Sequence, residues 1–321
     1  MRIALQIMRV HSPGMINRLL LCAFLITLAT GCKMRRTSSV VSGGPTTEAT
    51  IMGEVTVATW NLQWYPGKKA GDVPADDKDA HEAAVIDVLK DIDAGIICLQ
   101  EVRQDDAQGA LDRLCKATGH RLQVVSAFDG AQEIAILSRY QASAAFMEEF
   151  TATASRESTP PRGFAFAAFP LEGFKDAVLG VYSVHLKSNY GGTAETAPKR
   201  EESARQLVAH ADKMAAQYGT GFIAVIAGDL NVDPTRDDWK DEQTIPILTD
   251  AGFRWTGDGV PREDAVTWLS DGRYPDAVFD HILVRGSAVF SVSDVEVMPT
   301  DREVSDHRPA MVRIKVTGTK E

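Results

Sequence analysis

The chain has 321 residues, of which 44% are hydrophobic and 24% charged, and these globular values exclude a disordered or collagen-like protein. The formal net charge is −10, so any contact with a phosphate polymer has to depend on metal ions or on a local basic groove. Four cysteines in a chain of this length exclude a disulfide-stabilised scaffold.

The first 32 residues have the pattern of a bacterial export signal. An uncharged apolar run, Leu19–Ala29, follows Arg18 and is too short to cross a bilayer comfortably. It ends in Leu28-Ala-Thr-Gly-Cys32, which resembles a lipobox, although such motifs prefer Leu or Val where Ala29 stands. The resemblance implies that Cys32 is lipidated and becomes the mature N-terminus. The protein would then be exported to the periplasmic or outer-membrane face and held by a lipid anchor. An ordinary signal peptide cut nearby and an uncleaved anchor stay open.

Two further segments follow this signal. Residues 33–53 are rich in Ser, Thr, Gly and Pro and have no hydrophobic period, so we expect a flexible tether. Residues 54–321 are long enough for a single α/β domain, whose folded part we expect to run from Glu54 to about Val316.

Hydrophobic periodicity predicts a body of many strands and a few helices. Helical spacing follows Asp79, which can cap a helix, and recurs near residues 107–114 and after Pro198. The helices lie before or between β-rich stretches, which favours packed sheets with helices outside over a doubly wound sheet. The predicted strands are 55–60, 96–100, 122–126, 134–137, 164–169, 177–185, 222–227, 279–284, 289–297 and 310–316.

Polar side chains recur at the ends of these strands, where a rigid sheet can present them to a cleft. Carboxylate and amide oxygens suit Mg²⁺, Mn²⁺ or Ca²⁺ better than zinc, and no zinc-type Cys–His spacing occurs in the sequence. Neither a P-loop nor a Gly-x-Ser-x-Gly elbow is present. The strand-end residues are Asn61, Glu101, His185, Asp229, Asn231, Asp280, Asp306 and His307.

Seven short motifs in a fixed order give these residues a common meaning. They resemble the endonuclease/exonuclease/phosphatase superfamily, which contains deoxyribonuclease I and exonuclease III. The resemblance spans Trp60 to Pro309 and implies a four-layered α-β-β-α sandwich with two packed mixed β-sheets. It also implies divalent-metal hydrolysis of a phosphate ester at one edge of the sheets. The motifs are Thr59-Trp-Asn-Leu62, Leu99-Gln-Glu-Val102, Ile134-Ala-Ile-Leu-Ser-Arg139, Val184-His-Leu-Lys187, Gly228-Asp-Leu-Asn231, Phe279-Asp-His-Ile282 and Ser305-Asp-His-Arg-Pro309.

The resemblance assigns roles to the oxygen-bearing residues. Glu101 corresponds to the carboxylate that binds the catalytic Mg²⁺, while Asn61 and Asp306 support the same metal site. Mn²⁺ or Ca²⁺ would suit these ligands as well. Asp229 corresponds to the acid that positions or deprotonates the attacking water. Asn231 corresponds to the amide that holds a phosphoryl oxygen in the transition state.

Two histidines receive different roles from the same resemblance. His307 corresponds to a base or phosphate contact, and Asp280 to the acid that fixes its tautomer. His185 stands where the deoxyribonuclease I branch has a histidine proposed as general acid, and where abasic-site repair enzymes have a tyrosine. A glutamate on an earlier strand supports that histidine, and Glu133 lies in about the right place; a solvated strand-edge glutamate is the alternative.

Two basic residues are candidates for contacts with substrate phosphate. Lys187 lies on the same side of its strand as His185. Arg162 follows Pro160-Pro161 and matches a position that is often basic in the family. An ordinary solvated side chain is the alternative for both residues.

These features together predict an exported, lipid-anchored, metal-dependent phosphodiesterase that hydrolyses nucleic acid, and we expect a monomer with no protein partner. The His-Leu-Lys-Ser run at His185 resembles secreted nucleases more than inositol-phosphate phosphatases. A sphingomyelinase-like lipid phosphodiesterase and a phosphomonoesterase stay open, because loops that no motif fixes choose the substrate. The loops 67–77, 151–162 and 189–198 contain no long apolar hairpin that would favour membrane lipid. An inactive binding lipoprotein is a third possibility, which predicts losses among the motif residues, and none is lost.

Two cysteines, Cys98 and Cys115, lie in the folded body. One is in a predicted buried strand and the other lies beside the apolar stripe of the helix that follows. We expect two buried free thiols; the alternative is a disulfide, because an exported protein meets oxidants.

Overall fold

The computed structural model describes residues 50–152, 160–286 and 288–318. The expected signal peptide, the lipobox at Cys32 and most of the expected tether lie outside the described residues. Within the described residues, no helix is both long enough and apolar enough to cross a membrane.

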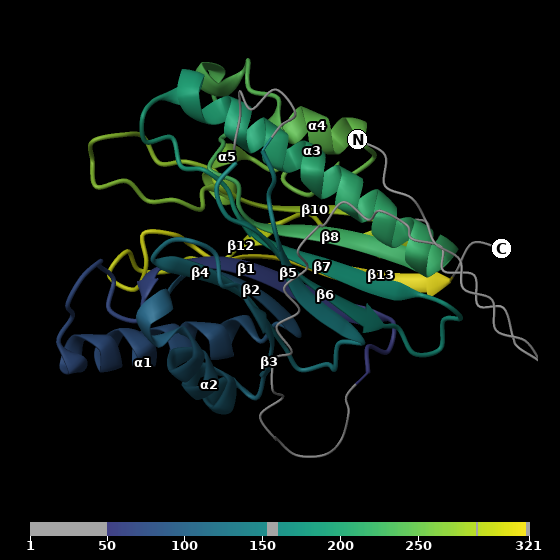
Figure 1. Ribbon diagram of the computed structural model, residues 1–321, viewed down its shortest axis with the longest axis horizontal. Helices are drawn as coiled ribbons and strands as arrows, with labels where there is room; N and C mark the ends of the chain where they lie inside the picture. Colours follow the sequence, from purple (N-terminus) through teal and green to yellow (C-terminus); the bar gives the residue numbers. More distant parts are fainter. Residues whose placement is uncertain (1–49, 153–159, 287, 319–321) are drawn as a thin grey trace, which may run out of the picture. The chain divides into compact units, whose positions relative to one another are not determined.

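The described chain forms two mixed β-sheets (Figure 1). One has seven strands in the order β11-β13-β1-β2-β4-β3, with β12 paired to β13, and the other has six strands in the order β5-β6-β7-β8-β10-β9. The strands of the first sheet are β1 (Glu54–Tyr65), β2 (Ile96–Arg103), β3 (Arg121–Val125), β4 (Gln132–Ser138), β11 (Val289–Val292), β12 (Glu296–Val297) and β13 (Ala310–Gly318). Those of the second are β5 (Ala144–Glu149), β6 (Gly163–Pro170), β7 (Val178–His185), β8 (Phe222–Asp229), β9 (Arg254–Trp255) and β10 (Asp280–Gly286).

Helices cover the outer face of each sheet and complete four layers (Figure 1). Helices α1 (Ala75–Ile92) and α2 (Ala107–Thr118) pack on the seven-stranded sheet. Helices α3 (Thr193–Tyr218) and α4 (Thr244–Asp250) pack on the six-stranded sheet. The α-β-β-α sandwich predicted from the sequence is therefore confirmed. The short helices are α5 (Arg262–Ala265) and the 3₁₀ turns Gln104–Asp106, Gly219–Gly221 and Asp237–Trp239.

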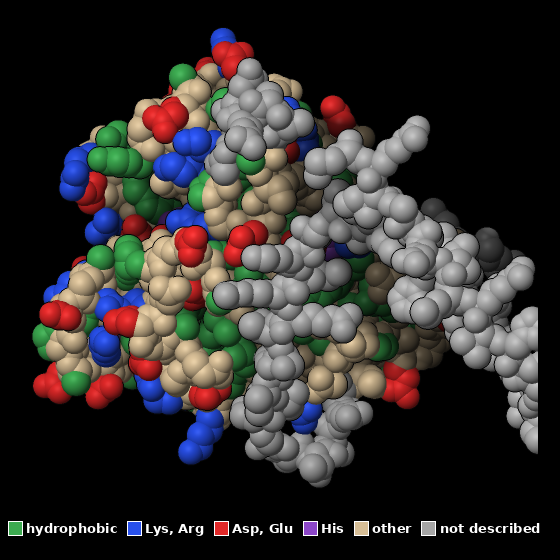
Figure 2. Space-filling model, in the orientation of Figure 1, with side chains coloured by type: hydrophobic (Ala, Val, Ile, Leu, Met, Phe, Trp, Pro, Cys, Tyr) green, Lys and Arg blue, Asp and Glu red, His purple; other side chains and the backbone are tan. Residues whose placement is uncertain are grey.

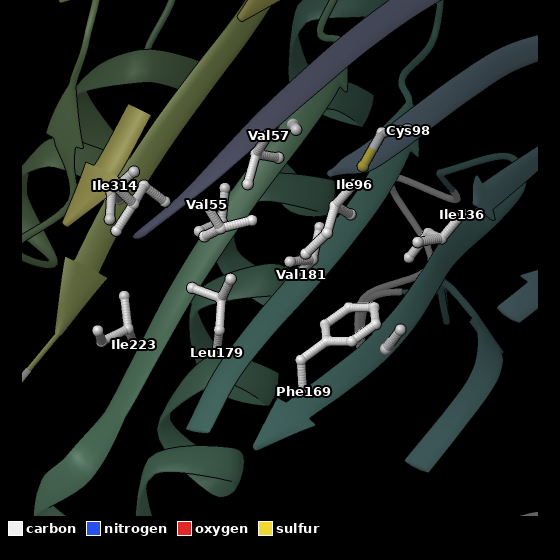
Figure 3. Packing of buried hydrophobic residues seen from close by; sticks show 14 of the residues in the cluster. Val55, Val57, Ile96, Cys98, Ile136, Phe169, Leu179, Val181, Ile223 and Ile314 are labelled. Carbon is white, nitrogen blue, oxygen red and sulfur yellow. The ribbon is translucent and has the colours of Figure 1, made fainter. Parts of the chain in front are cut away.

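The main core lies between the two sheets (Figure 3). Val55 and Val57 of β1 point to this core, whereas Ala58 and Trp60 belong to the cluster under α1 and α2. This division follows from the two-residue period of a strand. Because both faces of the central strands are buried, their sequences are almost continuously apolar, and polar residues are displaced to the strand ends.

The structure corrects several expected boundaries. Helix α1 begins at Ala75, before Asp79, since Pro74 presets its entry and Asp76 and Asp77 complement the helix dipole in the first turn. Helix α3 begins at Thr193 instead of after Pro198. Its first turn is closed there because the Thr196 hydroxyl donates to the Asn189 side chain and lies 3.0 Å from Gly192 O.

Other elements of the structure were not predicted from the sequence, or were predicted as one strand where the structure has two. Strand β5, the two-residue strand β9 and helix α4 were not predicted, and the expected strand 289–297 is divided into β11 and β12. Ile51, assigned to the tether, is buried and bridges to Leu171, so ordered packing begins slightly before Glu54.

Cys98 and Cys115 are both buried and free, as expected. Burial raises the pKa of the Cys115 thiol to about 12 and raises the pKa of Cys98 as well. Both side chains therefore act as small apolar groups in the core.

Candidate active site

Strand direction brings the predicted site residues to one edge of the sandwich. Strands β1 and β2 are parallel and end near Asn61 and Glu101, and β7 and β8 are parallel and end at His185 and Asp229. Strand β10 runs antiparallel to β8, so its first residue, Asp280, lies opposite Asp229. Strand β13 runs antiparallel to β1, with Ala310 opposite Thr59, so the preceding His307 reaches the same edge. This edge lies at the left in Figure 1.

Irregular backbone turns these side chains inward. The β1–β2 ladder shifts register after Asn61, and the β2–β4 ladder shifts between Leu99 and Val102, next to Glu101. Glu101 has φ 59°, Asn231 has φ 54° and Arg162 has φ 65°. Non-glycine residues rarely adopt this left-handed region, and strained backbone of this kind concentrates at functional sites.

Gly228 is required by a close approach between two parallel strands. A Cβ atom at this position would lie 2.0 Å from the backbone oxygen of Val184. The residue before Asp229 therefore has to be glycine if Asp229 and His185 are to meet at the ends of β8 and β7.

Asp229 occupies the middle of the site. Its Oδ2 accepts a hydrogen bond from Asn61 Nδ2 at 3.0 Å, and its Oδ1 accepts one from the backbone N–H of Asn231 at 2.9 Å. The same Oδ2 lies 3.5 Å from His185 Nε2 and 3.9 Å from His307 Nε2. Asp229 thus connects four of the predicted site residues through one buried carboxylate.

His307 forms a tight pair with Asp280. Its Nδ1 donates to Asp280 Oδ2 at 2.7 Å, and both side chains are buried. The carboxylate therefore fixes which ring nitrogen faces Asp229, as the resemblance implied. The other carboxylate oxygen of the pair, Asp280 Oδ1, has no hydrogen-bond partner among the described residues.

The two histidines have opposite shifts in pKa. Burial alone would lower the pKa of His307, but the charge and hydrogen bond of Asp280, together with the charges of Asp229 and Asp306, raise it to about 10. Burial lowers the pKa of His185 well below its usual value, and the charges of Arg162 and His307 act in the same direction. Without a bound metal ion, these shifts favour a cationic His307 and an uncharged His185 at neutral pH.

The acidic groups of the site gain protons more easily than usual. Burial raises the pKa of Asp229 to about 7, although the charge of His307 opposes this shift. Burial also raises the pKa of Glu101, and the charge of Asp306 adds to the effect. These shifts are the physical cost of gathering carboxylates where water is excluded.

Glu101 and Asp306 are held at the seven-stranded sheet. Glu101 Oε2 accepts the backbone N–H of Trp64 at 3.2 Å and Oε1 lies 3.8 Å from His185 Nε2. The backbone N–H of Asp306 donates to the side chain of Gln63 at 3.1 Å, and its carboxylate accepts Trp268 Nε1 at 3.3 Å. Neighbouring backbone and side-chain groups therefore orient both acids.

Three further residues that the sequence suggested for the site, Arg162, Lys187 and Glu133, lie in three different surroundings. Arg162 lies at the site: its guanidinium donates to the backbone oxygens of His185 and Leu186, both at 3.1 Å, and the charges of Glu101 and Asp229 oppose the lowering of its pKa by burial. Lys187 instead donates through Nζ to Ser188 O at 2.9 Å and Tyr190 O at 3.2 Å, so it closes its own loop.

Glu133 does not support His185. It is buried, not solvated, and its carboxylate accepts hydrogen bonds from Ser126 Oγ and the backbone N–H of Phe128. His185 faces Glu101 and Asp229 instead. The expected pairing fails because Glu133 lies opposite Val102 on β2 and serves the neighbouring turn.

Several supporting residues were not assigned a role from the sequence. Ser305 Oγ donates to Asn61 O at 2.8 Å and accepts the backbone N–H of His307 at 3.1 Å, while Trp60 Nε1 donates to His307 O at 2.9 Å. Ser305 and Trp60 both belong to the sequence motifs described above, so these motifs could have indicated their supporting role. Thr267 Oγ1 accepts the backbone N–H of Asp280 at 2.9 Å, and no motif pointed to it.

The donor set fits a divalent metal ion. Asp229, Asp280 and His307 are buried, and each offers one ligand atom within 4.8 Å of the others. Glu101, Asn61 and Asp306, the predicted metal side, border the same edge through the contacts described above. Oxygen ligands dominate, and a bound cation would stabilise the ionised forms of Asp229 and Glu101, whose pKa values burial raises.

The comparisons with known proteins agree with this site. The model of the endonuclease/exonuclease/phosphatase family matches residues 58–307. The chain belongs to the endonuclease/exonuclease/phosphatase family. It therefore has the phosphoesterase fold of that family, with a buried Asp/His cluster that can bind a metal ion. No curated protein sequence matches the chain significantly.

Solved structures share the fold over most of the chain. Truncated TDP2 from Caenorhabditis elegans is 20% identical with a TM-score of 0.60, covering 82% of this chain and 98% of that one. A family protein from Beutenbergia cavernae is 19% identical with a TM-score of 0.60, and the match covers 83% of this chain and 72% of that one. A family protein from Bacteroides vulgatus is 16% identical with a TM-score of 0.61, covering 82% and 99%. At these identities the likeness shows the fold alone.

Removing the charge of Asp280 should lower the pKa of His307. In metal-free Asp280→Asn, we expect a fall of roughly 1–3 pH units, because the carboxylate that stabilises the imidazolium is gone. NMR titration of the imidazole measures the pKa of His307 in the variant and in the wild-type protein. Asp212→Asn is the control, since Asp212 pairs with Arg285 on the surface of α3 and should leave His307 unchanged. An unshifted His307 in Asp280→Asn would contradict the assigned pairing.

Proposed function

We propose that this chain is an exported, divalent-metal-dependent phosphodiesterase that hydrolyses nucleic acid. The observation that carries the chemistry is the convergence of Glu101, Asp229 and His307, with the paired Asp280, at one sheet edge. The family description includes nucleases, and the His-Leu-Lys-Ser run resembles that of secreted nucleases, which supports the substrate.

The metal side of the proposal rests on oxygen ligands. Glu101, Asn61 and Asp306 would hold the ion, with Asp229 and Asp280 close enough to share it. Mg²⁺ suits this set, and Mn²⁺ or Ca²⁺ suits it as well. A bound divalent ion supplies a Lewis acid that neutralises charge on the phosphate.

The residues of the chain would divide the remaining work. Asp229, oriented by Asn61 and by the backbone of Asn231, accepts a proton from the attacking water. The Asn231 amide donates to a phosphoryl oxygen, where negative charge grows in the transition state. Without a bound metal ion His307 is favoured as a cation, because Asp280 raises its pKa, and this favours the role of phosphate contact over that of base.

Arg162 would stabilise the charge of the phosphate, and His185 would act on its leaving oxygen. Arg162 is anchored on the backbone of His185 and Leu186, so its charge stays beside the site. His185 has a lowered pKa and is uncharged in the free protein. The negative charge of a bound phosphate would favour its protonated form, which can then give a proton to the leaving oxygen.

Hydrolysis should require a divalent cation and the Asn231 amide. Excess chelator should abolish turnover and Mg²⁺ should restore it, because the clustered carboxylates need the cation.

Asn231→Ala should lower kcat by roughly 10²-fold, because it removes a donor to the transition state. Assays should cover plasmid DNA, RNA, sphingomyelin and phosphomonoesters. Full turnover in chelator would end the metal proposal, and activity confined to lipid or monoester would end the nucleic-acid proposal.

A leaving-group comparison tests His185 as the proton donor. His185→Ala should lose activity on DNA, whose leaving oxygen is basic, and the loss should shrink by about an order of magnitude on a p-nitrophenyl ester, which needs little protonation. Asn231→Ala is the matched control, because it acts on a phosphoryl oxygen and should lose the same factor on both substrates. Equal losses for His185→Ala would show that it holds phosphate instead.

The export proposal has an independent test at the lipobox. Cys32→Ser should release the protein from the membrane fraction of the bacterium, because the lipid would be attached to that sulfur. Immunoblots of membrane and soluble fractions measure the change, with Cys22→Ser as the control in the same apolar run. Equal membrane retention in Cys32→Ser would point to an uncleaved anchor.

A further inference from the structure

Exposed aromatic side chains stand on the two loops that border the site. Among the described residues, the large hydrophobic side chains that are strongly exposed are Tyr190 at 89%, Met52 at 74% and Tyr274 at 70%. Met52 precedes β1, whose other end carries Asn61, roughly 30 Å away along the strand. Tyr190, by contrast, belongs to the loop that follows His185, and Tyr274 to the loop that leads into Asp280.

Tyr190 projects from the loop between β7 and α3. This loop leaves β7 directly after His185, and Lys187 Nζ donates to its Ser188 and Tyr190 backbone oxygens. Arg200, buried and paired with Glu242, donates to Lys187 O at 2.8 Å and fixes the start of the loop. The loop backbone is thus held while the Tyr190 ring remains in solvent.

Tyr274 projects from a hairpin attached to His307. Trp268 and Ala277 pair at the base of the hairpin, and Trp268 also bridges to His307. The hairpin is fastened further where the backbone N–H of Leu269 donates to Asp306 O at 2.7 Å. Tyr274 lies beyond this base, and its backbone N–H is bonded to Ser270 Oγ at 3.2 Å. This ring is also exposed on an anchored loop.

The two loops border opposite ends of the row of site residues. Tyr190 follows β7, whose His185 faces Glu101 of β2. Tyr274 precedes β10, whose Asp280 faces His307 before β13. Asp229 of β8 lies between these two ends. Both loops lie at the left end of the sheets in Figure 1. A chain whose phosphate sits at Asp229 would therefore have one tyrosine on each side.

The surface charge disfavours recognition along a phosphate backbone. The net charge is −10, and Figure 2 shows acidic and basic side chains interspersed on the visible face without a continuous basic stripe among the described residues. Outside the site itself, several cations of the bordering loops are engaged within the protein: Lys187 holds its own loop, Lys68 donates to Arg302 O and Glu303 O, and Arg273 pairs with Asp271. A duplex gains its affinity mainly from such cations.

We propose that Tyr190 and Tyr274 stack on bases flanking the scissile phosphate, which makes single-stranded nucleic acid the preferred substrate. This inference rests on the proposed nuclease function and names its substrate class. Unpaired bases offer open faces that stack on aromatic rings, and this contact tolerates any base and requires little positive charge. In a duplex the same faces are covered by neighbouring base pairs, so neither tyrosine could reach them.

The test compares substrates that differ only in bases or pairing. The purified full-length protein with Mg²⁺ is assayed on a single-stranded DNA, its RNA equivalent, the DNA duplex and an abasic strand of equal length. Wild type should cleave at least one single strand roughly tenfold or more faster than the duplex. Tyr190→Ala and Tyr274→Ala should each lower the ratio of kcat/KM for base-carrying over abasic strand about 5- to 100-fold.

Matched variants separate stacking from structural damage. Tyr190→Phe and Tyr274→Phe keep the ring and should keep the ratio within about twofold of wild type. Met52→Ala removes an equally exposed apolar side chain far from the site and should behave as wild type. Circular dichroism melts check that every variant is folded.

Failure of the stacking inference can be distinguished from failure of the proposed function. Nucleic-acid cleavage with unchanged ratios in both alanine variants, or a preference for duplex, would overturn the stacking inference and leave the proposed function standing. Hydrolysis of bis(p-nitrophenyl) phosphate without cleavage of any DNA or RNA would overturn the nucleic-acid function and this inference with it.

Discussion

Burial of negative charge at one edge of the two sheets is the constraint on which the site depends. Asp229 and Asp280 are almost completely excluded from solvent, and Glu101 lies beside them. Buried carboxylates are costly unless hydrogen bonds or positive charge compensate for them. Here compensation comes from the Asn61 amide, the imidazolium of His307 and the nearby guanidinium of Arg162. The residual negative charge is what favours a divalent cation.

The same constraint gives the two histidines of the site opposite shifts in pKa. His307 has a carboxylate at 2.7 Å on Nδ1 and is stabilised as a cation. His185 is equally buried and its nearest carboxylate oxygen is 3.5 Å away, so burial lowers its pKa and the charges of Arg162 and His307 add to the effect. Rigid strand ends keep these distances fixed, so the same edge of the fold can hold His307 as a cation and His185 as an uncharged ring. Groups with opposed pKa shifts are what acid–base chemistry at neutral pH requires.

The loops around this edge set what can approach it. Their basic side chains are largely used to hold loop backbone, as Lys187 and Lys68 do, and the remaining surface is acidic on balance. The aromatic rings of Tyr190 and Tyr274 are exposed on loops beside the site, where they are available to stack on bases. A phosphoesterase core of this family with such a rim differs physically from one with a basic groove, because its binding would depend less on counterion release.

The layer order, the family and the residues that converge could all be predicted from the amino-acid sequence. Continuous apolar strands such as Phe222–Ala227 had to be buried, and the polar residues that end them, such as Asp229, had to appear at a sheet edge. Seven ordered motifs supplied the rest of that prediction. The exact partners were decided only by the tertiary structure. Glu133 was expected beside His185, yet the β2–β4 register places it opposite Val102, where its carboxylate binds Ser126. Lys187 was a candidate for a phosphate contact or a solvated side chain, yet its Nζ donates to the backbone of its own loop. Strand periodicity specifies the face of a side chain, whereas register, bulges and loop closure specify which atom it meets, and these depend on contacts between residues far apart in the chain.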